Sequence, residues 1–140
     1  LESDVPEKDS LIFSECFRTS KEDEHPERLA QIEKHTREIL SKYSPDELAI
    51  ENLFFNNNQK TALKVSEVRG LIIGIAKSSG LEVTEYTPPQ IKVAVTGDGR
   101  SDKKAIIKMI PLLVNITEEI KYDDEYDAIA CGLTHMACKR

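Results

Sequence analysis

The sequence lacks any apolar run that approaches the ~20 residues needed to span a bilayer. Its first ten residues, LESDVPEKDS, lack the apolar region of a secretory signal. A disulfide framework is also missing, because the three cysteines are odd in number and have no framework spacing. These absences exclude a membrane-spanning or disulfide-stabilised protein and predict a soluble, cytoplasmic one.

A net positive charge, the usual first sign of a nucleic-acid-binding protein, is missing as well, since the net charge is −6. The charges are unevenly distributed along the chain. Residues 1–55 carry 14 acids and 7 bases, residues 56–108 carry 5 and 9, and residues 109–140 carry 6 and 3. Residues 56–108 therefore form a basic segment, so the negative total does not by itself argue against a nucleic-acid partner.

No repeat and no low-complexity linker interrupts the 140 residues, which suits one globular domain over residues 1–140. Period-two and apolar patterns predict three strands, at residues 11–19, 47–51 and 81–86. Apolar residues at helical spacing predict helices that begin at Pro26, near Gln59, at Gln90, after Ser101 and near Asp123. This alternation predicts an α/β domain with a mixed sheet.

Three helix boundaries have specific sequence signals. Gly80 is expected to close the helix that begins near Gln59, because glycine tolerates the left-handed conformation found after helix ends. Ser101 is the expected N-cap of the helix that follows it. Pro111 is expected to end or kink that helix, because proline has no N–H to donate.

Four acidic side chains lie between Asp123 and Asp127, at the expected start of the last helix. Acids are favoured there by the helix dipole, and most acidic helix N-termini have no other role. Asp124 and Asp127 share one helix face. The small and apolar residues after Asp127 predict a buried helix, in which its carboxylate would be costly unless it is paired or bound to a metal ion.

Glu51 is a second acid in unusual surroundings, because it ends the apolar strand LAIE. Ligand sites gather at the carboxyl ends of strands in open α/β sheets. If Glu51 meets Asp124 and Asp127 there, the three carboxylates would suit hard divalent cations. A pair of such ions can activate water and stabilise the leaving oxygen in phosphodiester cleavage.

Three longer segments carry a more specific signal: LAIENLFFNNNQKTALKVSEVRG, IKVAVTGDGRSDKKAIIKMI and DDEYDAIACGLTH. In this order and at this spacing they resemble the bacterial RuvC-type Holliday junction resolvases, over residues from about 11 to 135. The resemblance implies a ribonuclease H-like three-layer fold, with a central mixed sheet flanked by helices. It also implies a magnesium-dependent endonuclease that acts as a homodimer on four-way DNA junctions, in recombination and repair.

The resemblance assigns roles to individual residues. Glu51, Asp124 and Asp127 match the catalytic, metal-binding acids of the family. This match implies two Mg²⁺ ions in each active site, with Mn²⁺ as an alternative. A branch-migration helicase complex is a further expected partner, in addition to junction DNA and a second copy of the chain.

Other residues are expected to contact DNA. Phe54 matches an aromatic residue that stacks on junction bases, although packing in the core is the alternative for Phe54 or its neighbour Phe55. Lys92 and Lys103 match basic residues that face the DNA backbone, and Lys104 is expected to do the same.

The sequence departs from the family pattern in two respects, of which one is Tyr126, at a position where the family usually has a small residue. The family's first catalytic aspartate lies on an N-terminal strand with a GIDPG-like signature, which this sequence lacks. The chain begins at Leu1 without a methionine, so we expect an incomplete N-terminus with the first strand absent. Two alternatives remain open: another ribonuclease H-like nuclease that acts on structured RNA or branched DNA, and a catalytically incomplete protein that only binds junctions.

Two cysteines and a histidine near the C-terminus raise the question of a structural zinc site. Cys131, His135 and Cys138 share one face of the expected last helix, and the family often has a histidine at the position of His135. A structural zinc site needs a fourth ligand, which this face does not supply. Ordinary packing is therefore the favoured interpretation of these three residues.

Overall fold

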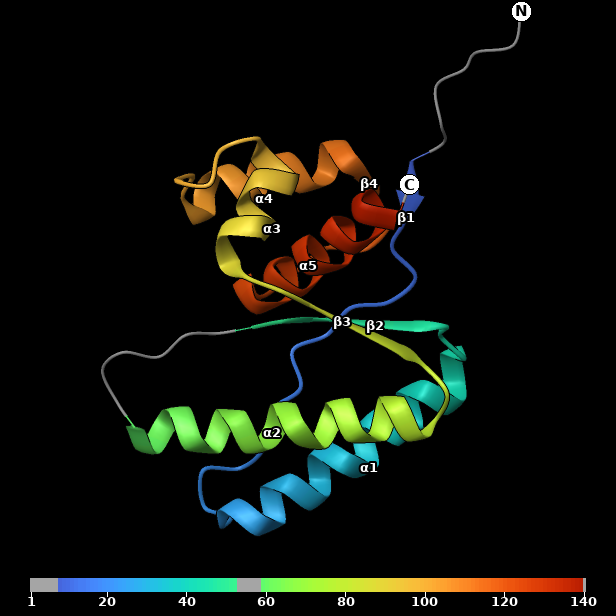
Figure 1. The fold of residues 1–140 in the computed structure, drawn as a ribbon, viewed down its shortest axis with the longest axis vertical. Helices are drawn as coiled ribbons and strands as arrows, with labels where there is room; N and C mark the ends of the chain where they lie inside the picture. Colours follow the sequence, from blue (N-terminus) through green and yellow to red (C-terminus); the bar gives the residue numbers. More distant parts are fainter. Residues whose placement is uncertain (1–7, 53–58, 140) are drawn as a thin grey trace, which may run out of the picture. The chain divides into compact units, whose positions relative to one another are not determined.

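The computed structural model describes residues 8–52 and 59–139, so the predictions for Phe54 and Phe55 lie outside the described residues. Its elements in chain order are β1 (Asp9–Ser10), α1 (His25–Tyr43), β2 (Glu47–Glu51), α2 (Gln59–Ser78), β3 (Glu82–Tyr86), α3 (Pro88–Thr96), α4 (Lys103–Leu113), β4 (Val114–Asn115) and α5 (Asp123–Lys139) (Figure 1). The predicted α/β class is confirmed. In the two described ranges, no helix is long and apolar enough to cross a membrane.

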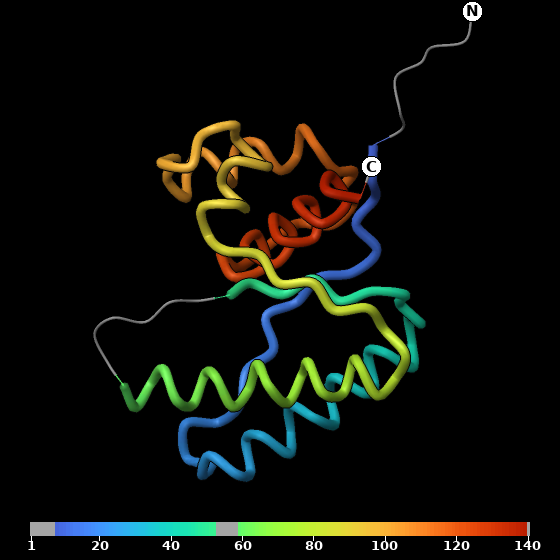
Figure 2. The backbone as a smooth tube through the Cα atoms, viewed as in Figure 1, coloured from blue at the N-terminus to red at the C-terminus, as the bar shows by residue number. Residues whose placement is uncertain are grey.

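The chain divides into two compact units, the terminal unit (residues 1–16 and 86–140) and the middle unit (residues 17–85). Figure 2 traces the middle unit from α1 through β2 and α2 to β3. In it α1 packs on α2, and β2 pairs with β3. The prediction that residues 1–140 form one domain stays a prediction.

The end of α2 shows how a local signal sets a boundary in the middle unit. Gly80 has a φ of +87°, which side-chain-bearing residues rarely adopt. Its N–H donates to the carbonyl oxygen of Lys77, and the N–H of Leu81 donates to that of Ala76. These two bonds form a Schellman motif, so the predicted role of Gly80 is confirmed.

In the terminal unit, α3, α4 and α5 pack on one another, and β1 pairs with β4 in parallel. Asp9 lies opposite Val114, and Ser10 lies opposite Asn115. The helices bury an apolar core whose main members are Ile91, Val95, Ile106, Ile110, Ile129 and Ala130. This core holds the start of α5 against the start of α4, which matters for the candidate site.

The predicted strand over residues 11–19 is wrong. The Leu11 N–H still donates to the carbonyl oxygen of Asn115, at 2.9 Å, but the following residues have no regular structure. Ile12 is 84% exposed, and its neighbours pair with no strand in the described part of the chain. The period-two pattern predicted extended backbone correctly, but a strand also needs a neighbouring strand to bond.

The start and the end of α4 differ by one to three residues from the predictions. Asp102, rather than Ser101, is the N-cap, because its carboxylate accepts a hydrogen bond from the Ala105 N–H at 2.9 Å. Pro111 does not end the helix, which continues to Leu113. The short strand β4, which follows at once, was not predicted from the sequence.

Candidate active site

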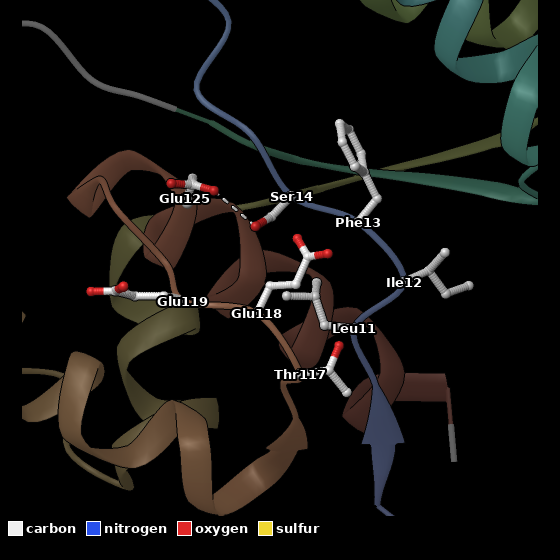
Figure 3. Close-up of a pocket in the computed structure, with 8 residues that line it drawn as sticks. All are labelled: Leu11, Ile12, Phe13, Ser14, Thr117, Glu118, Glu119 and Glu125. Atoms are coloured by element: carbon white, nitrogen blue, oxygen red, sulfur yellow. Dashed lines mark hydrogen bonds between the residues drawn. The ribbon is translucent and has the colours of Figure 1, made fainter.

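Glu125 is the buried acid at the start of α5, and only 6% of it is exposed. Its Oε1 accepts a hydrogen bond from the Ser14 hydroxyl at 2.9 Å, which Figure 3 shows as a dashed line. Its Oε2 accepts from the backbone N–H groups of Tyr122, at 3.0 Å, and Lys121, at 3.2 Å. Glu125 therefore reaches back to the N-cap residue Tyr122, as the glutamate of a capping box does, and fixes the first turn of the helix.

The hydrogen bonds of Glu125 also set its ionisation. Burial alone would raise the pKa of this carboxyl. The bonds from Ser14, Tyr122 and Lys121, together with the Lys121 charge, outweigh burial and hold the pKa of Glu125 below its usual range. The buried side chain is therefore a carboxylate whose charge is neutralised locally.

Asp124 and Asp127, on either side of Glu125, are accessible to solvent. Asp124 is exposed, and its Oδ2 accepts a weak bond from the Cys16 thiol at 3.7 Å. The Asp127 side chain is 39% exposed, so the prediction that its carboxylate is buried is wrong. The buried residues Ile129, Ala130, Cys131, Thr134 and His135 follow Asp127 in α5, and Asp127 lies at the N-terminal end of the face that they form.

Lys103, the first residue of α4, lies next to Asp127. Its Nζ donates a hydrogen bond to Asp127 Oδ2 at 3.0 Å. This bond, with the negative charges of Asp127, Asp123 and Asp124, raises the pKa of Lys103, although burial acts in the opposite direction. Asp127 is thus paired with a basic side chain. Lys104 is exposed and Lys92 is half-buried.

Glu51 lies at the carboxyl end of β2 in the middle unit, where it is half-buried. Arg69, on α2, binds the chain at this point, because its Nε donates to the Glu51 carbonyl oxygen at 3.1 Å. Its Nη2 forms an ion pair with Glu85, near the end of β3. A single guanidinium therefore connects the ends of both strands.

The three predicted metal ligands are divided between the two units, with Glu51 in the middle unit and Asp124 and Asp127 in the terminal unit. Within residues 8–52 and 59–139, no three His, Cys, Asp or Glu side chains form a group that could hold a metal ion. The structure brings Asp124 and Asp127 onto one turn of helix. Their exposed carboxylates are the donor type that hard divalent cations prefer.

A small cavity of about 60 Å³ lies beside Glu125 in the terminal unit. Figure 3 shows its lining residues: Leu11, Ile12, Phe13, Ser14, Thr117, Glu118, Glu119 and Glu125. This volume suits a few water molecules rather than a nucleotide.

His135, two turns beyond Asp127, is buried and bonded. Its Nδ1 lies 2.7 Å from the Tyr86 hydroxyl, and the two rings meet edge to face. Burial raises the pKa of Tyr86, and the nearby Cys138 thiol adds to the effect. These contacts agree with the packing interpretation of the residue.

Sequence reasoning did not identify the residues that hold the candidate ligands in place. Glu125 has no recognisable capping signature, because Tyr122 occupies the N-cap position where serine or threonine would mark a capping box. Arg69 lies 18 positions from Glu51, and no local pattern connects them. Ser14 lies 111 positions from Glu125.

Comparisons with known proteins bear on this site. The family model described as crossover junction endodeoxyribonuclease RuvC matches residues 3–135. The chain is 39% identical over 128 residues to the protein of that name from Moorella thermoacetica, covering 91% of this chain and 76% of the relative. It is 43% identical over 131 residues to that from Petrotoga mobilis, covering 94% and 80%.

Two solved structures are also similar. The Thermus thermophilus RuvC structure has a TM-score of 0.84 at 29% identity, covering 96% of this chain and 81% of that one. T. thermophilus RuvC in complex with a Holliday junction substrate has a TM-score of 0.86 at 29% identity, covering 94% and 79%.

Proposed function

This chain belongs to the crossover junction endodeoxyribonuclease RuvC family, and from that membership we propose which of its residues cut a four-way DNA junction. The resemblance seen in the sequence and the ribonuclease H-like fold class are confirmed. The chain is a structure-specific endonuclease of the kind that resolves Holliday junctions in recombination and repair. This membership favours junction cleavage over a nuclease for other substrates, and the junction-binding alternative stays open to the assay below.

Asp124, Asp127 and Glu51 are the proposed metal ligands. The observation that supports them most directly is the pair of exposed carboxylates one turn apart at the start of α5. Nucleases of this family depend on metal ions, and we propose Mg²⁺, two ions in each site, with Mn²⁺ as a substitute. When bound, two such ions lower the pKa of the attacking water and stabilise the leaving oxygen.

Other residues hold these ligands and the DNA. Glu125 fixes the first turn of α5 and so keeps Asp124 and Asp127 on one face, while Arg69 holds the backbone at Glu51. Three basic side chains are proposed to contact DNA phosphates: Lys92, Lys103 and Lys104. Each such contact releases a counterion from the DNA. Phe54, which lies outside the described residues, is proposed to stack on a base at the junction.

Assembly and location are part of the same proposal. The chain is proposed to work in the cytoplasm as a symmetric homodimer beside a branch-migration helicase, because two nicks in opposite strands need two sites. The helix α2 is the proposed dimer surface. Its apolar residues are incompletely covered, since only Ile75 and Ala76 are buried and Leu63 is largely exposed.

A cleavage assay with matched substrates tests the function. The protein, expressed with any residues that its gene encodes before Leu1, is mixed with Mg²⁺ and either a four-way junction, a linear duplex of the same sequence or a structured RNA. Paired nicks confined to the junction are expected. Cleavage of the RNA would favour a different ribonuclease H-like nuclease, and binding without nicks would favour the junction-binding alternative.

A further inference from the structure

We propose that Lys103 occupies the Asp127 carboxylate while no metal ion is bound, and that a divalent cation must displace the lysine to bind there. The displaced ammonium then becomes available to a DNA phosphate next to the metal ion. This inference rests on the proposed function, because it takes Asp127 to be a metal ligand. It assigns to Lys103 a role distinct from that of the other lysines on this surface.

The geometry of the pair carries the inference. The Lys103 Nζ donates to Asp127 Oδ2 at 3.0 Å. The two residues lie at the starts of α4 and α5, two helices that pack on each other, so the contact does not depend on a flexible loop. The ammonium thus takes up one of the two Asp127 oxygens that a cation could use.

Lysine and a metal ion cannot share this oxygen without a cost. A divalent cation binds carboxylate oxygens at roughly 2.0–2.1 Å in the case of Mg²⁺. An ion so close to Oδ2 would lie beside the Lys103 ammonium, and the two positive charges repel each other. Both side chains of the ion pair are partly exposed, at 46% and 39%, and such pairs are weak enough to exchange.

The next residue provides an internal comparison. Lys104 carries the same charge, but it is exposed and has no carboxylate partner among the described residues. A general electrostatic effect of basic residues on metal binding would apply to Lys103 and Lys104 alike. Displacement applies to Lys103 alone, so the two lysines should behave differently in the same experiment.

Mn²⁺ binding to the protein without DNA tests the proposal. Titrations compare wild type, Lys103→Gln, Lys104→Gln and Asp127→Asn. Losing the competing ion pair should increase the Mn²⁺ affinity of Lys103→Gln by roughly two- to fivefold, with a smaller change for Lys104→Gln. Equal affinities in the two lysine variants would overturn the inference while leaving the metal site intact. Unchanged Mn²⁺ binding in Asp127→Asn would instead overturn the site itself.

A second measurement uses the wild-type protein, so it does not depend on whether a variant folds. An amine-acetylating reagent is applied with and without Mg²⁺, and the modification of each lysine is measured by mass spectrometry. Mg²⁺ should increase acetylation at Lys103, because its ammonium is released, and should leave Lys104 unchanged. Equal or reduced acetylation of Lys103 in Mg²⁺ would refute displacement.

Discussion

Replacing Arg69 should damage both the stability of the protein and the chemistry at Glu51. The Arg69 side chain is only 20% exposed, and it donates to the Glu51 carbonyl oxygen at 3.1 Å. A hydrogen bond from a charged donor contributes about 1.5–3 kcal/mol. The ion pair with Glu85, which is 46% exposed, adds only about 0.2–1 kcal/mol. Arg69→Met should therefore lower the free energy of unfolding by about 2–4 kcal/mol.

Activity should also fall, for a reason that is separate from unfolding. Residues that hold a metal ligand in place typically change metal affinity or activity by about 10–100-fold when they are replaced. Arg69→Met should reduce junction cleavage by about that factor, because the end of β2 is no longer held. Arg69→Lys keeps the charge but loses the planar guanidinium that bonds two partners at once. Compared with Arg69→Met, it should therefore restore the free energy of unfolding more than the cleavage rate.

Urea unfolding and single-turnover cleavage are measured on the same preparations, at a temperature where each variant is fully folded. Arg37→Met is the matched control, because Arg37 forms an exposed pair with Glu33 on α1 and should cost at most about 0.5 kcal/mol. Glu85→Gln removes the ion pair but keeps the bond from Arg69 to the Glu51 carbonyl oxygen, so it measures the contribution of the ion pair alone. If Arg69→Met is folded and cleaves junctions within twofold of the wild-type rate, the proposed role of Arg69 is wrong.

Three further predictions concern the helix start, the DNA surface and the dimer. Because the folded-state pKa of Glu125 is depressed, its stabilisation is present at neutral pH and is lost as the pH falls through that pKa. In the presence of a chelator, Glu125→Gln should thus lower the midpoint temperature of unfolding at pH 7, and the midpoints of variant and wild type should converge at acid pH. A difference in midpoint that does not depend on pH would contradict this. Lys104→Ala should flatten the dependence of log junction affinity on log salt concentration by about 0.9. Phe54→Ala should weaken junction binding without changing this slope, because stacking releases no counterion. An unchanged slope in Lys104→Ala would remove Lys104 from the DNA surface. Sedimentation of the folded protein at micromolar concentration should show a dimer, and a monomer alone would count against paired nicking.

Several helix boundaries were predictable because they have local signals. Pro26 suits the first turn of α1, and Gly80 supplies the left-handed residue after α2. The helix α3 begins at Pro88, two residues before the predicted Gln90, because the Thr87 and Gln90 side chains form a capping box there. Such signals act over three or four residues, so one sequence is enough to find them. The family, too, was identified from three local segments, which the comparison confirms.

Properties that depend on distant partners were not predictable. The segment after Leu11 looks like a strand, but its polar side chains bond α5 instead, with Ser14 binding Glu125. For the same reason, the sequence predicts Asp127 as the buried acid of the cluster, whereas the structure buries Glu125. Burial of Glu125 depends on Ser14 and on the turn before α5, whereas the exposure of Asp127 depends on where α4 places Lys103. The pairing of β1 with β4 joins residues about a hundred positions apart.

Junction cleavage by charge-removing variants tests whether the proposed ligands hold the metal ions. Glu51→Gln and Asp127→Asn keep the shape of each side chain but lose the charge that a divalent cation needs. Asp123→Asn is the control, because Asp123 is an exposed acid on the same turn that is not a proposed ligand. Both ligand variants should bind a four-way junction about as well as wild type and fail to nick it, while the control should nick it normally. Nicking near the wild-type rate by Glu51→Gln or Asp127→Asn would show that the varied residue is not a metal ligand.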